Sequence, residues 1–305
     1  MKMHTAHSVW LSTGLCGLLA FASTKPLPEL QAQPSLGFLI GKHVTSVVRL
    51  SKAPATNNSA QGGTAVVMTG PSEQVISRAF AVRKGKAADE LLVEQLVQRV
   101  QMTVVSPLGK SEYDSNNSFE RDLVTAALGQ RYDPYISKPR TSVYPNRTNS
   151  ATPVADPKFE SVWTTNLPTL CGTNVVQGIV LAHVPANPNP GSAWVDSVRN
   201  GQTMTVNRYK VVKKDGDLLM LALTSRLAPG VRQSQTSSSA GPSGMASATS
   251  TINVVEYDGE LRVRQASGFV EEMHLTKHTV SVVNAAGQSM TNEATAKVDL
   301  TNSIR

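Results

Sequence analysis

Residues 205–227 read TVNRYKVVKKDGDLLMLALTSRL, and this stretch decides the fold class. Apolar and polar residues alternate on both sides of Asp215-Gly216. A period of two is expected of strands that bury one face, and Asp-Gly supplies the positive φ angles that a tight β-turn needs. We therefore predict a β-hairpin with strands at 205–213 and 217–227.

The same alternation recurs toward both ends of the chain. Gly-containing turns separate the alternating segments, as in an antiparallel meander. The expected strands of the C-terminal half, besides the hairpin, are 252–257, 259–265, 269–283 and 288–300. Those of the N-terminal half are 42–50, 64–68 and 76–82, with 52–63 expected to be a loop.

Segment 91–105 fits two periods. Leu92, Leu96 and Val100 share a helical stripe, whereas Leu96, Val100 and Met102 share one face of a strand. The β-branched end at residues 103–105 favours the strand. By contrast, residues 118–129 (SFERDLVTAALG) begin with a capping Ser and end with Gly, which predicts a short helix.

These segments predict a mainly β protein, a curved antiparallel sheet in a half-barrel-like meander with one or two short covering helices. An N-terminal β half is expected at 23–145 and a C-terminal β half at 161–305, joined by a linker at 146–160. Residues 233–250, almost all Ser, Ala, Gly, Thr and Gln, predict a flexible loop. One sheet or two domains both fit this organisation.

The first 22 residues resemble a secretory leader. Lys2 precedes an apolar run at 9–20, which ends in Ala20-Phe21-Ala22, and this pattern is typical of a cleaved signal peptide. The run is shorter than the ~20 apolar residues of a membrane-spanning helix. Lipidation of Cys16 is the alternative, disfavoured because Leu15 precedes it. We expect a secreted or periplasmic protein of the bacterial cell envelope.

Composition argues against nucleic-acid binding. The formal charge is +7 and the isoelectric point about 9.5, but the basic residues are scattered singly along most of the chain. Aromatic residues make up 5% of the chain, too few for a platform on which bases stack. A solvated basic surface explains the charge.

Nucleophile and phosphate-loop motifs are weak or missing. Cys171 is the one cysteine after the leader, so no intramolecular disulfide is expected and a passive thiol is the favoured state. Gly109-Lys110-Ser111 ends like a phosphate loop, but Val104 stands where the first Gly is required. No Gly-x-Ser-x-Gly or His-Glu-x-x-His sequence occurs. A triad assembled from scattered residues stays open.

The sharpest metal candidate is Glu271 with His274 and His278. On a helix these side chains share a face and suit zinc. Their neighbours are β-forming, and residues four apart on a strand lie ~13 Å from each other, too far for one ion. Exposed strand histidines are the favoured interpretation. The other histidines after the leader are His43 and His183.

Three motifs together resemble an uncharacterised family of secreted bacterial β-rich proteins, a domain of unknown function. They are Arg99-x-Gln101-Met102 with Gly109 and Glu112-Tyr113-Asp114-Ser115; Pro188-x-Pro190-Gly191-Ser192-x-Trp194 before the hairpin; and Gly268-Phe269-Val270 with Gly287-Gln288-Ser289-Met290. The resemblance implies a strongly curved sheet with helical cover, similar to periplasmic lipoprotein carriers, and brings no catalytic residues. Trp194 is expected over the core and Asp114 and Ser115 on local backbone.

The sequence therefore predicts no catalytic, cofactor-binding or metal residue, and no enzyme. We expect an exported envelope protein that shelters an apolar ligand, a lipid or a lipidated partner, in its curved sheet. Methionines suit an adaptable lining; they are Met102, Met204, Met220, Met273 and Met290. The alternative is a structural or protein-binding module without a pocket, acting through sheet edges or the Ser-rich segment. Membrane association stays open, with no transmembrane segment expected after the leader.

Overall fold

The computed structural model describes twelve stretches of the chain. They are residues 36–59, 66–69, 72–88, 90–106, 109–117, 140–145, 170, 179–200, 203–228, 233–241, 244–285 and 288–305. Within them a 3-10 turn, η1 (Leu36–Leu39), precedes the first strand.

The other elements are strands. They are β1 (His43–Lys52), β2 (Ala55–Ser59), β3 (Val66–Thr69), β4 (Ser72–Lys84), β5 (Glu90–Ser106), β6 (Gly109–Asp114), β7 (Arg140–Pro145), β8 (Ala193–Asn200), β9 (Thr203–Asp215), β10 (Leu218–Leu227), β11 (Gln233–Gly241), β12 (Gly244–Arg264), β13 (Val270–Ala285) and β14 (Gln288–Ile304).

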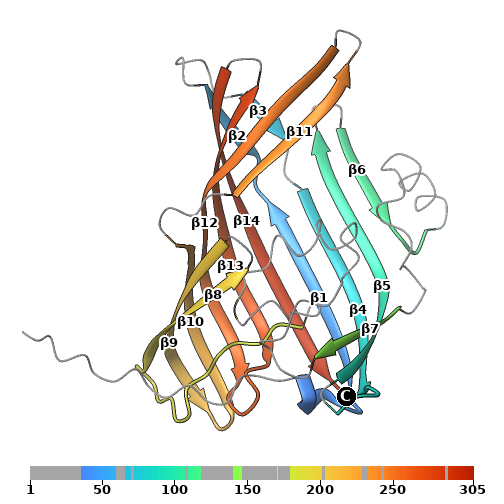
Figure 1. Cartoon of the computed structure of the whole chain (residues 1–305), viewed down its shortest axis with the longest axis vertical. Coiled ribbons are helices and arrows are strands. Elements are labelled where there is room, and N and C mark those ends of the chain that lie inside the picture. Colours follow the sequence, from blue (N-terminus) through green and yellow to red (C-terminus); the bar gives the residue numbers. More distant parts are fainter. Residues whose placement is uncertain are drawn as a thin grey trace, which may run out of the picture.

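Among the described residues, all fourteen strands belong to one sheet that is not closed. Its main path runs β6-β5-β4-β1-β14-β13-β12-β10-β9-β8, while β2, β3, β7 and β11 pair beside this path. Every strand pairing is antiparallel, and β1 pairs with β14 along nine register positions. Figure 1 shows the long strands side by side, with the sheet curving from β5 and β6 round to β8–β10. Because the first and last strands are neighbours, the two predicted halves form one sheet.

Alternation gives the sheet two chemically different faces. On β10, Leu219, Leu221 and Leu223 are fully buried, whereas Met220 between them is exposed. We call the face with the buried side chains the inner face. The outer face carries cross-strand ion pairs, among them Arg49–Glu73, Arg226–Glu256 and Arg262–Glu272. Exposed pairs of this kind are typical of a sheet surface in contact with water.

A short segment of the chain, residues 179–184, lies across the inner face, and we call it the strap. Val180 and Ala182 belong to the larger core cluster, while Ile179 and Leu181 belong to the smaller one. The larger cluster holds buried side chains of β1, β8–β10 and β12–β14, among them Leu50, Tyr209, Leu221, Met273 and Leu300. The smaller holds residues of η1, β1, β4 and β5, among them Leu39, Val44, Phe80 and Leu91. The strap therefore contributes alternate side chains to the two core clusters.

Most predicted strands are confirmed. The hairpin of residues 205–227 is β9–β10, with φ of 57° at Gly216 in its turn. Segment 91–105 is a strand, and 42–50, 76–82 and 269–283 also lie in strands. The predicted loop at 52–63 is wrong in part, because β2 occupies 55–59 and pairs with β14 and β3.

The prediction of a flexible loop at 233–250 is wrong. Residues 233–241 form β11 and residues 244–250 begin β12, and the two pair in register from Gln233–Ile252 to Gly241–Gly244. Composition alone misleads here because Ser and Thr also suit strands when a neighbouring strand offers its backbone groups. For β11, this neighbouring strand is the first part of β12. β12 is itself paired with β13, as far as Ala248–Ala285.

A predicted break in the last meander is also absent. Residues 252–257 and 259–265 were expected as separate strands around Gly259, but β12 runs through this position. Gly259 has φ of 156°, and a Cβ built there lies 2.1 Å from the backbone oxygen of His274. The glycine therefore marks a close approach of β12 to β13 rather than a turn.

The predicted covering helices are the part of the predicted fold that is not confirmed. The predicted helix at 118–129 lies outside the described residues, as do the leader, the linker at 146–160 and Cys171. In the part of the chain that the structure describes, no helix is long and apolar enough to cross a membrane.

Candidate functional site: a polar row on the inner face

The register aligns a row of polar side chains across the otherwise apolar inner face. From β8 to β1, the aligned positions are Asp196, Asn207, Ser225, Tyr257, Lys277, Ala296 and Lys52, of which Ala296 is the one apolar residue. We call this set the polar row. The next row toward the strap is mostly apolar, with Tyr209, Leu223, Leu275, Val298 and Leu50. The polar row thus borders the larger core cluster.

Two lysines form the positive end of the polar row. Both pair in register with Ala296, Lys52 from β1 and Lys277 from β13. They are therefore two strand spacings apart, ~10 Å between Cα atoms, on either side of a small side chain. The Lys277 ammonium lies 5.6 Å from the centroid of the Tyr257 ring, within the range of a cation–π contact.

Burial makes Lys277 unlike an ordinary surface lysine. Desolvation, and to a smaller extent the charge of Lys52, lower the pKa of Lys277 to about 8. Desolvation also raises the pKa of the Tyr257 phenol above its ordinary value. The positive end therefore holds a desolvated lysine beside a buried phenol and a second lysine that is exposed.

Ser225 lies at the middle of the polar row with no exposed surface. Among the described residues its hydroxyl has no hydrogen-bond partner. A buried hydroxyl without a partner costs roughly 1–3 kcal/mol, so this position does not serve stability alone.

At the other end of the polar row, Asp196 contacts His183 of the strap. The His183 Nδ1 is 2.8 Å from Asp196 Oδ2. Trp194 donates its indole N–H to the His183 carbonyl at 3.0 Å and stacks on Tyr209 with ring centroids 5.2 Å apart. The Tyr209 hydroxyl donates to the Leu170 carbonyl at 3.3 Å. The contacts of His183 tie the strap to β8, and the Tyr209 hydrogen bond ties Leu170 to β9.

The other end of the strap is held by backbone hydrogen bonds. Ala182 N–H donates to the Gly268 carbonyl at 2.7 Å, and Val270 N–H donates to the Val180 carbonyl at 3.0 Å. Leu181 also forms an isolated bridge with Phe269. The strap is therefore an integral part of the core, and it occupies the inner face below the polar row.

A second set of buried polar residues lies on the inner face of the N-terminal strands. Ser46 pairs in register with both Asn302 and Arg78, and Arg78 is only 2% exposed. Asn302 donates from Nδ2 to the Val270 carbonyl at 2.9 Å. This set adjoins the strap and the smaller cluster, so we assign these residues to the core.

The zinc candidates do not converge. All three lie on β13, where His274 pairs with Asp299 at 2.8 Å on the outer face. Glu271 contacts Arg262 and Arg264, and His278 pairs in register with Glu256. Among the described residues no group of three His, Cys, Asp or Glu side chains is arranged for a metal ion. The prediction that 271–278 is a strand is confirmed.

The methionines predicted to line the sheet divide between its faces. Met273 is buried on the inner face. Met102 and Met290 also take inner positions by register, whereas Met204 and Met220 lie on the outer face. A common methionine lining is therefore wrong for two of the five.

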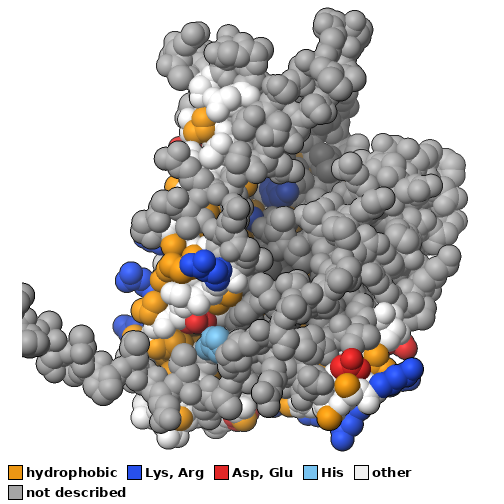
Figure 2. Space-filling model, viewed as in Figure 1, with side chains coloured by type: hydrophobic (Ala, Val, Ile, Leu, Met, Phe, Trp, Pro, Cys, Tyr) orange, Lys and Arg blue, Asp and Glu red, His pale blue; other side chains and the backbone are white. Residues whose placement is uncertain are grey.

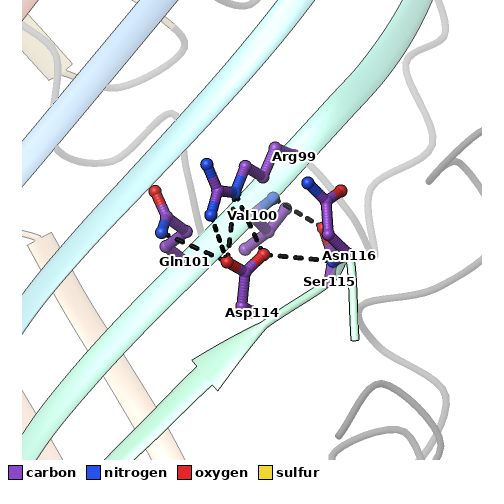
Figure 3. Close-up of polar contacts among 6 residues, drawn as sticks. All are labelled: Arg99, Val100, Gln101, Asp114, Ser115 and Asn116. Carbon is purple, nitrogen blue, oxygen red and sulfur yellow. Dashed lines mark hydrogen bonds and ion pairs between the residues drawn. The ribbon is translucent and has the colours of Figure 1, made fainter. Parts of the chain in front are cut away.

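The first motif of the resemblance forms one contact cluster, which Figure 3 shows. Asp114 Oδ1 accepts from Arg99 Nε at 3.0 Å and from Asn116 N–H at 3.1 Å, and its Oδ2 accepts from Gln101 Nε2 at 3.3 Å. The hydrogen bond from Arg99 is the main reason that the pKa of Asp114 lies below its ordinary value. Ser115 exchanges hydrogen bonds with the Val100 backbone at 2.9 Å in both directions.

This cluster fastens the edge strand β6 to β5. Every carboxylate oxygen of Asp114 accepts a hydrogen bond within the cluster, which leaves little reason to assign it a ligand. The expected bond of Asp114 to local backbone is confirmed by Asn116 N–H, and so is the expected core position of Trp194. For Ser115 the prediction of a local partner is wrong, because its hydroxyl accepts from Val100 N–H on the neighbouring strand β5. Lys110, from the rejected phosphate loop, forms an ion pair with Glu112 on β6.

The polar row was missed at the level of sequence. Its members are scattered from residue 52 to residue 296, and each is unremarkable in its own strand. Only the register between six pairs of strands aligns them. A sequence signal existed in one place, where Lys277 follows the apolar positions Met273 and Leu275 on the same face of β13.

Comparisons with known proteins leave the chain without an assigned relative. No family model matches it, and no curated protein does. One solved structure that aligns, described as "Asymmetric conductivity of engineered proteins", is 7% identical with a TM-score of 0.24, over 84% of this chain and 99% of that chain. Another is the toluene transporter TodX of P. putida, 7% identical with a TM-score of 0.22, over 90% of this chain and 92% of that chain. Scores this low support no statement about fold or function.

Proposed function

We propose that the protein is an exported, non-catalytic binding protein of the bacterial cell envelope, which shelters the apolar part of a ligand or lipidated partner on its inner face. One observation supports this proposal most. Beyond the polar row, on the side away from the strap, the inner face carries the half-buried apolar side chains Val255, Ile252 and Ala294, which alternate in register with Thr279, Ser281 and Asn292. An open sheet with such positions suits a ligand that is partly apolar.

The strap limits where such a ligand binds. Below the polar row the inner face is filled by the protein's own residues 180, 182 and 184. The ligand therefore belongs above the polar row, along β12, β13 and β14. A helix at 118–129, as the sequence predicts, fits this proposal as additional cover.

A neutral apolar dye tests the proposal. N-phenyl-1-naphthylamine is expected to bind saturably with increased fluorescence, and Val255→Asp is expected to abolish the binding because it places a carboxylate on the inner face. Val212→Asp is the matched control, since Val212 is 52% exposed on the outer face. Equal binding by both variants, or no saturable binding by the unchanged protein, contradicts the proposal.

Export is tested separately. Cleavage after Ala22, as the leader predicts, gives a secreted form that begins at Ser23. Intact-mass measurement of the protein from the culture medium or the periplasm detects this form. A cytoplasmic protein of full length contradicts this part of the proposal.

A protein-binding module is the second candidate, and the free sheet edges favour it. In the described part of the chain, β8 pairs only with β9 and β6 only with β5, and unpaired edges can accept a further strand. This candidate predicts that an envelope protein cross-links to β8 or β6 and that Val255→Asp leaves this cross-link unchanged.

A further inference from the structure

We propose that the outer face of β8, β9 and β10 docks on the surface of an anionic phospholipid membrane. This inference goes beyond the proposed function and does not rest on it, because it concerns the opposite face of the sheet. The docking surface, which we call the basic patch, consists of neighbouring outer-face positions on these three strands. They are Ala193 and Val195 on β8; Arg208, Lys210, Val212 and Lys213 on β9; and Met220 and Ala222 on β10. Figure 2 shows basic side chains that project from the left margin of the molecule beside hydrophobic ones, where Figure 1 places β9 and β10.

Exposed apolar side chains gather on the basic patch. Among the described residues four large hydrophobic side chains are exposed, and three of them lie here: Val195 is 47% exposed, Val212 52% and Met220 39%. Met220 pairs in register with Lys213, and the register shift between β9 and β10 leaves Val212 as the extra residue. Such a bulge changes the direction of side chains locally, and here both Val212 and Lys213 are exposed. Apolar and basic side chains therefore reach the solvent next to each other.

The basic side chains of the patch are not neutralised by the protein itself. Elsewhere on the outer face several basic side chains form cross-strand ion pairs, as Arg49 does with Glu73. Among the described residues, Arg208, Lys210 and Lys213 take part in no ion pair. Three cations on one strand that lack a counter-charge produce a local positive potential.

Carboxylates lie at the border of the basic patch rather than within it. The described outer-face positions of β8, of β9 as far as Lys213, and of β10 hold basic, apolar or small polar side chains. The bordering carboxylates are Asp258 and Glu260 on β12, and Asp215 and Asp217 at the hairpin turn. An anionic surface is therefore attracted to β8 and β9 and repelled beyond β10, which fixes the side on which it docks.

The composition of the basic patch favours a membrane over a protein as the partner. Protein interfaces are enriched in aromatic residues and depleted in lysine, whereas the patch has two lysines and no aromatic residue. Basic side chains are attracted by the negative surface potential of anionic lipids, and apolar side chains between them can enter the head-group layer. Both features of the patch thus suit a lipid such as phosphatidylglycerol.

Co-sedimentation with vesicles tests the inference. The protein is expected to bind vesicles of equimolar phosphatidylglycerol and phosphatidylcholine, less at higher salt, and to bind vesicles of phosphatidylcholine alone only weakly. Lys210→Gln is expected to lower the partition coefficient about fivefold, which is equivalent to about 1 kcal/mol for one basic residue near an anionic surface. Val212→Asp is expected to lower it at least as much, because an apolar side chain is replaced by a charge that the lipid repels.

Lys297→Gln is the matched control. Lys297 is exposed on the outer face of β14, where it pairs in register with Thr276 and Ser51. The substitution removes the same charge outside the basic patch, so the partition coefficient is expected to change less than about twofold. Thermal unfolding of each variant shows whether it is folded.

The outcomes separate the inference from the proposed function. Val212→Asp is expected to lose vesicle binding and keep dye binding, and Val255→Asp is expected to do the reverse. If Lys297→Gln weakens vesicle binding as much as Lys210→Gln, general surface charge explains the binding and the inference is overturned. If vesicles do not bind, the inference is wrong, and binding of poly-L-glutamate that Lys210→Gln weakens would then assign the basic patch to an acidic protein.

Discussion

Gly259→Ala is the substitution whose cost the geometry defines best. The new Cβ would lie 2.1 Å from the backbone oxygen of His274 and 2.9 Å from the Cα of Leu275. Because both atoms belong to the backbone of β13, no rotation of a side chain removes the clash. The φ of 156° adds a conformational cost, since a residue with a Cβ rarely adopts it.

The expected loss of stability combines these two costs. Overpacking of a core costs roughly 1–3 kcal/mol, and an unfavourable backbone conformation costs a further 1–3 kcal/mol, roughly. We expect Gly259→Ala to lower the free energy of unfolding by about 3 kcal/mol or more. The free energy comes from urea denaturation followed by circular dichroism.

Gly216→Ala separates the clash from the conformation. Gly216 also has a positive φ, 57°, but no atom lies within 4 Å of a Cβ built there. Its expected cost is the conformational part alone, about 1–2 kcal/mol. If Gly259→Ala costs no more than Gly216→Ala, β12 and β13 do not approach as closely as described, and the register that builds the polar row is wrong.

Three further predictions concern the inner face. Lys277→Met is expected to raise the free energy of unfolding at neutral pH and to remove part of the pH dependence of stability. The pKa of Lys277 is about 8 in the folded protein against an ordinary 10.5. Between these values the unfolded chain binds more protons than the folded protein, so wild-type stability rises from pH 8 to 10.5. Denaturant titrations across this range check it, and the same rise in Lys277→Met as in Lys297→Met contradicts it. Ser225→Ala is expected to keep or raise the melting temperature, because it removes a buried hydroxyl without a partner; a loss above about 1 kcal/mol would reveal a hydrogen bond there. Trp194→Phe is expected to cost about 1 kcal/mol by urea denaturation, because the hydrogen bond to the His183 carbonyl is lost, and an unchanged midpoint argues against that tie.

The strands could be predicted where the sequence alternates. The hairpin at 205–227 and the strand at 91–105 follow from local pattern, because each has one apolar face. Residues 233–250 could not, since their side chains carry no alternating polarity and pairing with a neighbouring strand decides their state. Gly259 misled for a related reason: a glycine in sequence reads as a turn, whereas a close approach between strands is a tertiary fact.

The candidate site was hidden from sequence for a different reason. Lys52 and Lys277 are 225 positions apart in the sequence, and they are neighbours in the polar row because both pair with Ala296. No periodicity in either strand shows this pairing. His274 and His278 show the opposite case. They are close in sequence, but two residues that lie four apart on a strand cannot share one ion.

Photo-crosslinking with a fatty acid that carries a diazirine near the middle of its chain tests most directly whether the inner face above the polar row shelters an amphiphile. The result we predict is label on peptides that contain Ile252, Val255 or Ala294, reduced by Val255→Asp and by excess palmitate. Label confined to outer-face positions such as Val212 and Met220, or label that excess palmitate leaves unchanged, would contradict it.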